Sequence, residues 1–130
     1  MEDQIYRESL LEVAQNPKNR GEIDNPDLEA RLVNPLCGDE VWIQLKIQNP
    51  GSKIQKATFS GNGCAISQAS ASLLATYIEG EPLDEVKKLK TSDILKLVGI
   101  NPTPARMGCA LLSLNVLKEA LINGTEGESR

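Results

Sequence analysis

The stretch VWIQLKIQNPGSKIQKATFSG, residues 41–61, determines the fold that we expect of this chain. Apolar residues occupy every second position from 41 to 47, which is the period of a half-buried β-strand. The NPGS segment at 49–52 indicates a turn, and residues 53–61 then form the returning strand of an antiparallel pair. A short apolar segment, LEARLV at residues 28–33, predicts a third strand.

Helical periodicity surrounds this strand region. Amphipathic or apolar spacing predicts helices at residues 2–15, 64–78, 83–90, 92–98 and 105–122. Strands in the first half and helices in the second indicate an α+β fold, in which a small antiparallel sheet is packed against several helices. With 130 residues and no internal repeat, we expect a single domain over residues 1–130, with residues 123–130 as a flexible polar tail.

Composition excludes several classes of function. The net charge of −4 argues against a nucleic-acid surface, because phosphate neutralisation needs clustered lysine and arginine. No apolar run approaches the roughly 20 residues that span a bilayer, so no membrane partner is expected. The N-terminus lacks the features of a signal peptide, which predicts a cytoplasmic location.

The chain contains three cysteines and no histidine. Without histidine, Cys–His and Ser–His nucleophile pairs are excluded. Three thiols cannot all pair, and the cytosol disfavours disulfides. Soft metal ligands are therefore restricted to the thiols, and carboxylates would have to complete a four-coordinate site.

Each cysteine is predicted to lie where an element begins or ends. Cys37 lies in the NPLCGD loop before the main strand, Cys64 begins the middle helix, and Cys109 lies near the start of the last helix. Helix N-termini favour the thiolate that metal binding and sulfur transfer require. Asp39 follows Cys37 by two residues and would point to the same side of an extended segment. Arg106 precedes Cys109 by three, which places a cation on the same helical face.

Each of these residues also has an ordinary structural interpretation. A single cysteine is often a small buried hydrophobic residue, and Cys109 is followed by Ala-Leu-Leu. Arg106 can be a solvated surface charge, and Asp39 can be a turn carboxylate. The SQASAS segment at 67–72 can be a close-packed helix face of small side chains. The chain has no CxxC motif, so cysteine spacing alone gives a weak metal signal.

The joint pattern is more specific. NPLCGD, GNGCAISQASAS and PARMGCALLSL occur in the order and approximate spacing of the U-type iron–sulfur cluster assembly proteins, the IscU, SufU and NifU N-terminal family. YRESLLEVAQNPKNRGEI also resembles that family's opening helix and connector. The resemblance covers about residues 5–122. It implies a SufE/NifU-like fold, a three-stranded antiparallel sheet packed with helices.

The resemblance also implies a site. By position, Cys37, Asp39, Cys64 and Cys109 match the family's metal or cluster ligands, and Arg106 matches a basic residue that gives electrostatic support. Such a site holds Zn²⁺ or Fe²⁺, or a transient [2Fe–2S] cluster. The implied partners are a cysteine desulfurase of the SufS, IscS or NifS type, which donates sulfur as a persulfide, and apoproteins that receive the cluster.

Three features separate the chain from individual branches of the family. Gly108 stands where the IscU branch has a histidine. NPTPAR replaces the LPPVK segment that an Hsp70-type chaperone reads, so the resemblance does not extend to a dedicated chaperone partner. The PARxxCA wording resembles SufU, yet the 45-residue step from Cys64 to Cys109 (109 − 64) lacks SufU's insertion of roughly 20 residues. The chain thus resembles SufU at the site and IscU in length.

The main functional hypothesis is a non-enzymatic scaffold that accepts sulfur, binds iron, assembles a [2Fe–2S] cluster and transfers it. Asp39 is the harder, weaker ligand, which suits a site that must release its cluster. Cys37, in a Pro/Gly loop, is predicted to accept sulfur first, with Cys109 as the rival. The alternatives are a zinc-dependent sulfur acceptor for a SufS-type desulfurase, and a structural zinc interaction module. Asp39 counts against the last, because structural zinc sites are built from Cys and His.

Overall fold

A computed structural model describes residues 11–35, 38–48, 52–99 and 104–123, without the side chains of 104–106 and 123. Residues 11–15 are helical and form the end of the predicted helix 2–15. The strands that follow are β1 (Leu28–Val33), β2 (Glu40–Gln48) and β3 (Lys53–Asn62), and the helices are α2 (Ala65–Ile78), α3 (Leu83–Val86), α4 (Thr91–Val98) and α5 (Pro104–Asn123).

The three predicted strands form one antiparallel sheet in the order β1-β2-β3. The predicted hairpin has Ile43 opposite Phe59 and Leu45 opposite Ala57, so apolar residues of both strands share a face. The register shifts between Lys46 and Ile47, near the end of the hairpin. The predicted turn at 49–52 lies largely outside the described residues.

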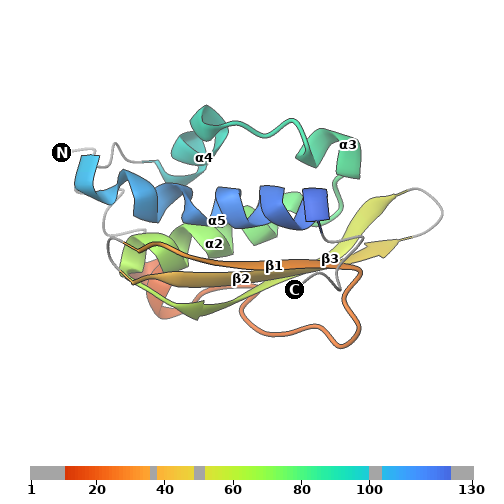
Figure 1. The fold of residues 1–130 in the computed structure, drawn as a ribbon, viewed down its shortest axis with the longest axis horizontal. Coiled ribbons are helices and arrows are strands. Elements are labelled where there is room, and N and C mark those ends of the chain that lie inside the picture. The colour runs from red at the N-terminus through yellow and green to blue at the C-terminus, as the bar shows by residue number, and fades with distance from the viewer. Residues whose placement is uncertain (1–10, 36–37, 49–51, 100–103, 124–130) are drawn as a thin grey trace.

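The helices cover one face of the sheet (Figure 1). Helix α5 packs on β1 and β2, α2 packs on β3, and α4 contacts both α2 and α5. The core between these layers is aliphatic around a single phenylalanine, with Val41, Ile43, Leu45 and Phe59 fully buried. This arrangement confirms the predicted α+β class.

The opposite face of β2 is not simply polar and exposed, because the connector before β1 reaches it. Gln44 is buried there: its Oε1 accepts a hydrogen bond from the Ile23 backbone N–H (2.9 Å), and its Nε2 donates to Glu29 Oε1 (3.1 Å). A buried amide needs such partners, since an unpaired one would be costly. The alternation in the sequence therefore predicts the strand but not the burial of its polar side.

The helices differ from the prediction mainly at their ends. α3 has four residues where the sequence pattern predicts a helix over 83–90. α4 begins where Asp93 Oδ2 accepts from the Lys90 backbone N–H (2.8 Å), and it ends at Gly99, whose φ of 78° is left-handed. α5 begins at Pro104, a residue that suits the first helical position.

The start of the first helix falls outside the described residues, and so does the predicted tail at 123–130, apart from Asn123, which ends α5. The single domain over residues 1–130 stays a prediction. Among the helices that the structure describes, none is both long and apolar enough to cross a membrane.

Candidate metal centre

Three side chains of metal-ligand type converge in the folded chain. Asp39 directly precedes β2, Cys64 is the N-cap residue of α2, and Cys109 lies in α5. One ligand atom from each, all lying within 4.8 Å of one another, would surround a common ion. Two thiolates on one tetrahedral zinc lie about 3.8 Å apart, because the Zn–S bond is about 2.3 Å long. The longest separation thus exceeds this spacing by at most about 1 Å (4.8 − 3.8), and the three residues fit a small ion or cluster.

A closed backbone turn places Asp39. The Asn34 backbone N–H donates to the Asp39 carbonyl, and the Gly38 N–H donates to the Asn34 carbonyl, both at 2.7 Å. Gly38 has a φ of +75°, a left-handed conformation that glycine adopts without strain. These bonds fix Asp39 between the end of β1 and the start of β2, where the residue is 6% exposed.

Two glycines bring the backbone before Cys64 close to this turn. A Cβ on Gly61 (φ +118°) would overlap the Glu40 carbonyl oxygen. A Cβ on Gly63 would lie 3.1 Å from Asp39 Cγ. The half-buried Cys64 makes no side-chain capping bond to α2, so its sulfur is not committed to the helix backbone.

Ser67, which the sequence suggests only as part of a close-packed helix face, contacts all three residues. Its Oγ donates to Asp39 Oδ2 at 2.6 Å and also lies 3.3 Å from the Cys109 carbonyl oxygen. The Cys64 thiol donates to Ser67 Oγ at 3.8 Å. Ser67 is 1% exposed, so its contacts with Asp39 and with the Cys109 carbonyl are shielded from water. The sequence feature that could have identified Ser67 is its spacing, since a residue three positions after Cys64 lies on the same helical face.

The other predicted site residues are only partly described. Cys37 lies outside the described residues. Arg106 belongs to α5 together with Cys109, as predicted, but its side chain is not described. Cys109 is the sixth residue of α5 (104 to 109), one position further from the helix start than the predicted start at 105 implies, and it is 2% exposed. The field of the helix terminus falls off within the first turn, so burial rather than the helix start sets the surroundings of Cys109.

Gly108 lies beside the turn that carries Asp39. A Cβ at this position would lie 2.8 Å from Asn34 Nδ2, closer than a real Cβ contact allows. Any side chain at position 108 therefore requires the half-buried Asn34 amide to move.

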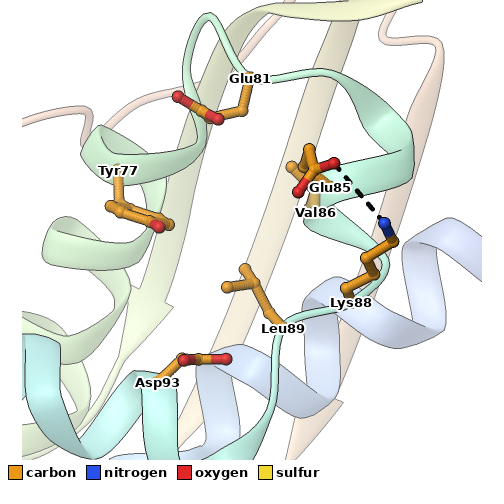
Figure 2. A pocket seen from close by; sticks show the side chains of 7 residues that line it. All are labelled: Tyr77, Glu81, Glu85, Val86, Lys88, Leu89 and Asp93. Atoms are coloured by element: carbon orange, nitrogen blue, oxygen red, sulfur yellow. Dashed lines mark ion pairs between the residues drawn. The ribbon is translucent and has the colours of Figure 1, made fainter.

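A second hollow is acidic and lies between the end of α2, α3 and α4 (Figure 2). It has a volume of about 210 Å³, and Glu85 in it pairs with Lys88 at 3.6 Å. Its lining consists of Tyr77, Glu81, Glu85, Val86, Lys88, Leu89 and Asp93. It offers carboxylate oxygens but no thiol, and so it lacks the soft ligands of the Asp39–Cys64–Cys109 cluster.

Known proteins resemble this chain in sequence and in fold. The chain is 34% identical over 133 residues to the iron–sulfur cluster assembly scaffold protein IscU of Thermotoga maritima, covering 90% of this chain and 92% of that protein. It is 29% identical over 136 residues to the zinc-dependent sulfurtransferase SufU of Bacillus subtilis, covering 92% and 90%. The crystal structure of a SUF-system SufU protein from Fervidobacterium islandicum superposes with a TM-score of 0.77 and 28% identity, covering 93% of this chain and 99% of that one.

The family model described as the NifU-like N-terminal domain matches residues 5–127, nearly the whole chain. This match agrees with the sequence motifs, with the three-stranded sheet and its helices, and with the fold of the solved relative. The chain therefore belongs to the NifU-like N-terminal domain family.

Proposed function

We propose that this protein is a scaffold on which an iron–sulfur cluster is assembled and then released to apoproteins. The observation that carries the proposal is the convergence of Asp39, Cys64 and Cys109 within 4.8 Å, from three different elements. Family membership supports it, since related chains are named as iron–sulfur cluster assembly scaffolds. The partners would be a cysteine desulfurase and recipient apoproteins, in the cytoplasm.

The ligand set would comprise Cys37, Asp39, Cys64 and Cys109. Thiolates bind iron and zinc strongly, whereas a carboxylate oxygen is a harder and weaker ligand for a cluster. Ser67 binds one Asp39 oxygen, and a carboxylate has a second oxygen with which to bind a metal. The cluster is cargo, and the same residues would hold Zn²⁺ or Fe²⁺ before assembly.

Sulfur would arrive as a persulfide on the desulfurase. We assign its acceptance to Cys37: its thiolate attacks the outer sulfur, a new S–S bond forms, and the desulfurase S–S bond breaks. The desulfurase cysteine leaves as a thiolate, so the step needs no external oxidant or reductant. Burial of the rival supports this order, because Cys109 is only 2% exposed. Arg106 would attract the anionic persulfide.

A second candidate function is a zinc-dependent sulfur acceptor. The surroundings of Gly108 favour it, because the Asn34 side chain occupies the room that a side chain at position 108 would need. The IscU branch has a histidine at this position. The SufU relative named a zinc-dependent sulfurtransferase points to the same function. A purely structural zinc module fits less well, since Asp39 lies in the cluster and Cys64 is partly exposed.

Anaerobic reconstitution with iron, cysteine and a desulfurase, followed by transfer to an apo-ferredoxin, tests the proposal. Formation of a [2Fe–2S] absorption spectrum and its appearance on the ferredoxin would support the scaffold. Faster desulfurase turnover with zinc-loaded protein, and no cluster under any loading, would instead support the zinc-dependent acceptor.

A further inference from the structure

The connector before β1 is bonded both to β3 and to α2. The Gly21 N–H donates to the Phe59 carbonyl, and the Phe59 N–H donates to the Asn19 carbonyl, both at 2.9 Å. On the other side, Ser72 Oγ donates to the Lys18 carbonyl at 2.8 Å. The connector therefore lies against the strand and the helix that precede and follow Cys64.

Arg20 extends this attachment towards the candidate metal centre. Its Nη2 donates to the Gly61 carbonyl at 2.9 Å, and its Nη1 donates to Gln68 Oε1 at 2.6 Å. Its guanidinium carbon lies 5.6 Å from the centre of the Phe59 ring, within cation–π range. One planar guanidinium thus bonds the end of β3 and the first turns of α2 at once, which a lysine ammonium does not reproduce.

The two acceptors bracket Cys64 in the chain. Gly61 precedes it by three residues, and Gln68 follows it by four and donates its backbone N–H to the Cys64 carbonyl at 3.0 Å. The Cys64 thiol makes no capping bond to the backbone of α2, and its one bond to that helix in the described part of the chain is the long contact with Ser67 Oγ at 3.8 Å. The Arg20 bonds anchor the start of α2 without using the sulfur.

We propose that Arg20 is a positioning residue that holds Cys64 at the distance from Asp39 and Cys109 at which a metal or cluster is bound. This inference rests on the proposed function for its biological meaning, but its geometry does not depend on which metal is bound. It assigns a role in the site to a connector residue 44 positions before Cys64 (64 − 20).

The test compares Arg20→Met, which keeps the aliphatic stem and removes the donors, with a matched control. Lys46→Met is that control, because Lys46 also binds the connector, through the Asn25 carbonyl (2.9 Å) and Asp27 (3.7 Å), but away from Cys64. Metal-free protein is alkylated briefly under native conditions, and peptide mass mapping gives the rates at Cys64 and Cys109 in the same molecules. Zn²⁺ affinity is then measured by competition with a chromophoric chelator.

Arg20→Met should raise the alkylation rate of Cys64 about fivefold, leave that of Cys109 unchanged, and weaken Zn²⁺ binding about fivefold, the loss expected when two solvent-exposed hydrogen bonds are removed. Lys46→Met should change none of these. Equal acceleration at both cysteines would mean general loosening, and an unchanged Cys64 rate would mean no positioning; either result overturns the inference.

If Arg20→Met does not fold, Gln68→Met carries the test, because it removes one acceptor and leaves Arg20 in place. The same selective rise at Cys64 is expected, and its absence overturns the inference. The alkylation measurement needs neither metal nor desulfurase. Wild-type protein that binds no Zn²⁺ and forms no cluster would therefore refute the proposed function, and the alkylation rates would still test the positioning role of Arg20.

Discussion

Replacing Ser67 by alanine removes the hydroxyl that contacts all three described residues of the candidate centre. Its bond to Asp39 Oδ2 is 2.6 Å long, in the range of charge-assisted O–H···O⁻ bonds, and both residues are buried. A hydrogen bond to a charged group contributes roughly 1.5–3 kcal/mol, so Ser67→Ala should lower the free energy of unfolding of the metal-free protein by about 2 kcal/mol. At ~4 °C per kcal/mol for a domain of this size, the melting temperature falls by about 8 °C.

Urea denaturation in the presence of a chelator measures this loss, which should appear as a lower midpoint with an unchanged m-value. Zn²⁺ affinity is measured separately and should fall about tenfold, because a ligand loses the partner that orients it. The two readouts report the same bond in the empty and in the loaded protein.

Ser70→Ala is the matched control. Ser70 lies one turn further along α2 and is equally buried, but within the described part of the chain its hydroxyl has no hydrogen-bond partner. Removing an unpaired buried hydroxyl should leave stability unchanged or raise it. Equal losses in the two variants would refute the argument, since they would reflect the packing of α2. A rise in Zn²⁺ affinity in Ser67→Ala would refute the orienting role, because the hydroxyl would then be competing with the metal for Asp39.

Three further outcomes are expected. Asp39→Ala should still acquire a cluster but transfer it several-fold more slowly to an apo-ferredoxin, because no weak oxygen ligand remains to be displaced; equal or faster transfer half-times would contradict this. In urea titrations, Gly108→Ala should be more favourable by about 1 kcal/mol in an Asn34→Ala background than in the wild type, since the contact at 2.8 Å is then relieved; strictly additive effects would exclude that contact. Zn²⁺ at 100 times its dissociation constant should stabilise the protein by about 2.7 kcal/mol, and a melting curve indifferent to added zinc would argue against any metal centre.

The sheet could be predicted from the sequence because short local patterns determine its strands. Alternation over residues 41–47 and the NPGS turn signal predict an antiparallel pair of strands, and β2 and β3 form it. The helices were placed by apolar spacing with errors at their ends, as at α3, where short-range signals for helix and turn overlap.

The candidate site could be predicted from the sequence only in part. Motif wording points to Asp39, Cys64 and Cys109, but Ser67 becomes visible only when the rotation of α2 relative to Asp39 is known. Arg20 is harder still, since its acceptors lie 41 and 48 residues away along the chain. Periodicity encodes which face of an element is apolar, and it does not encode which distant side chain meets that face.

The spacing of the three candidate ligands along the chain has a consequence for biosynthesis. Asp39, Cys64 and Cys109 are separated by 25 and 45 residues (64 − 39 and 109 − 64), and they come from a strand start, a helix start and the last helix. On the ribosome, a chain that has not yet reached residue 109 holds at most two of them, with α5 still incomplete. The emerging polypeptide therefore cannot enclose a metal ion among these three groups. If the three groups hold a metal as proposed, its binding by all of them would have to await the formation of α5.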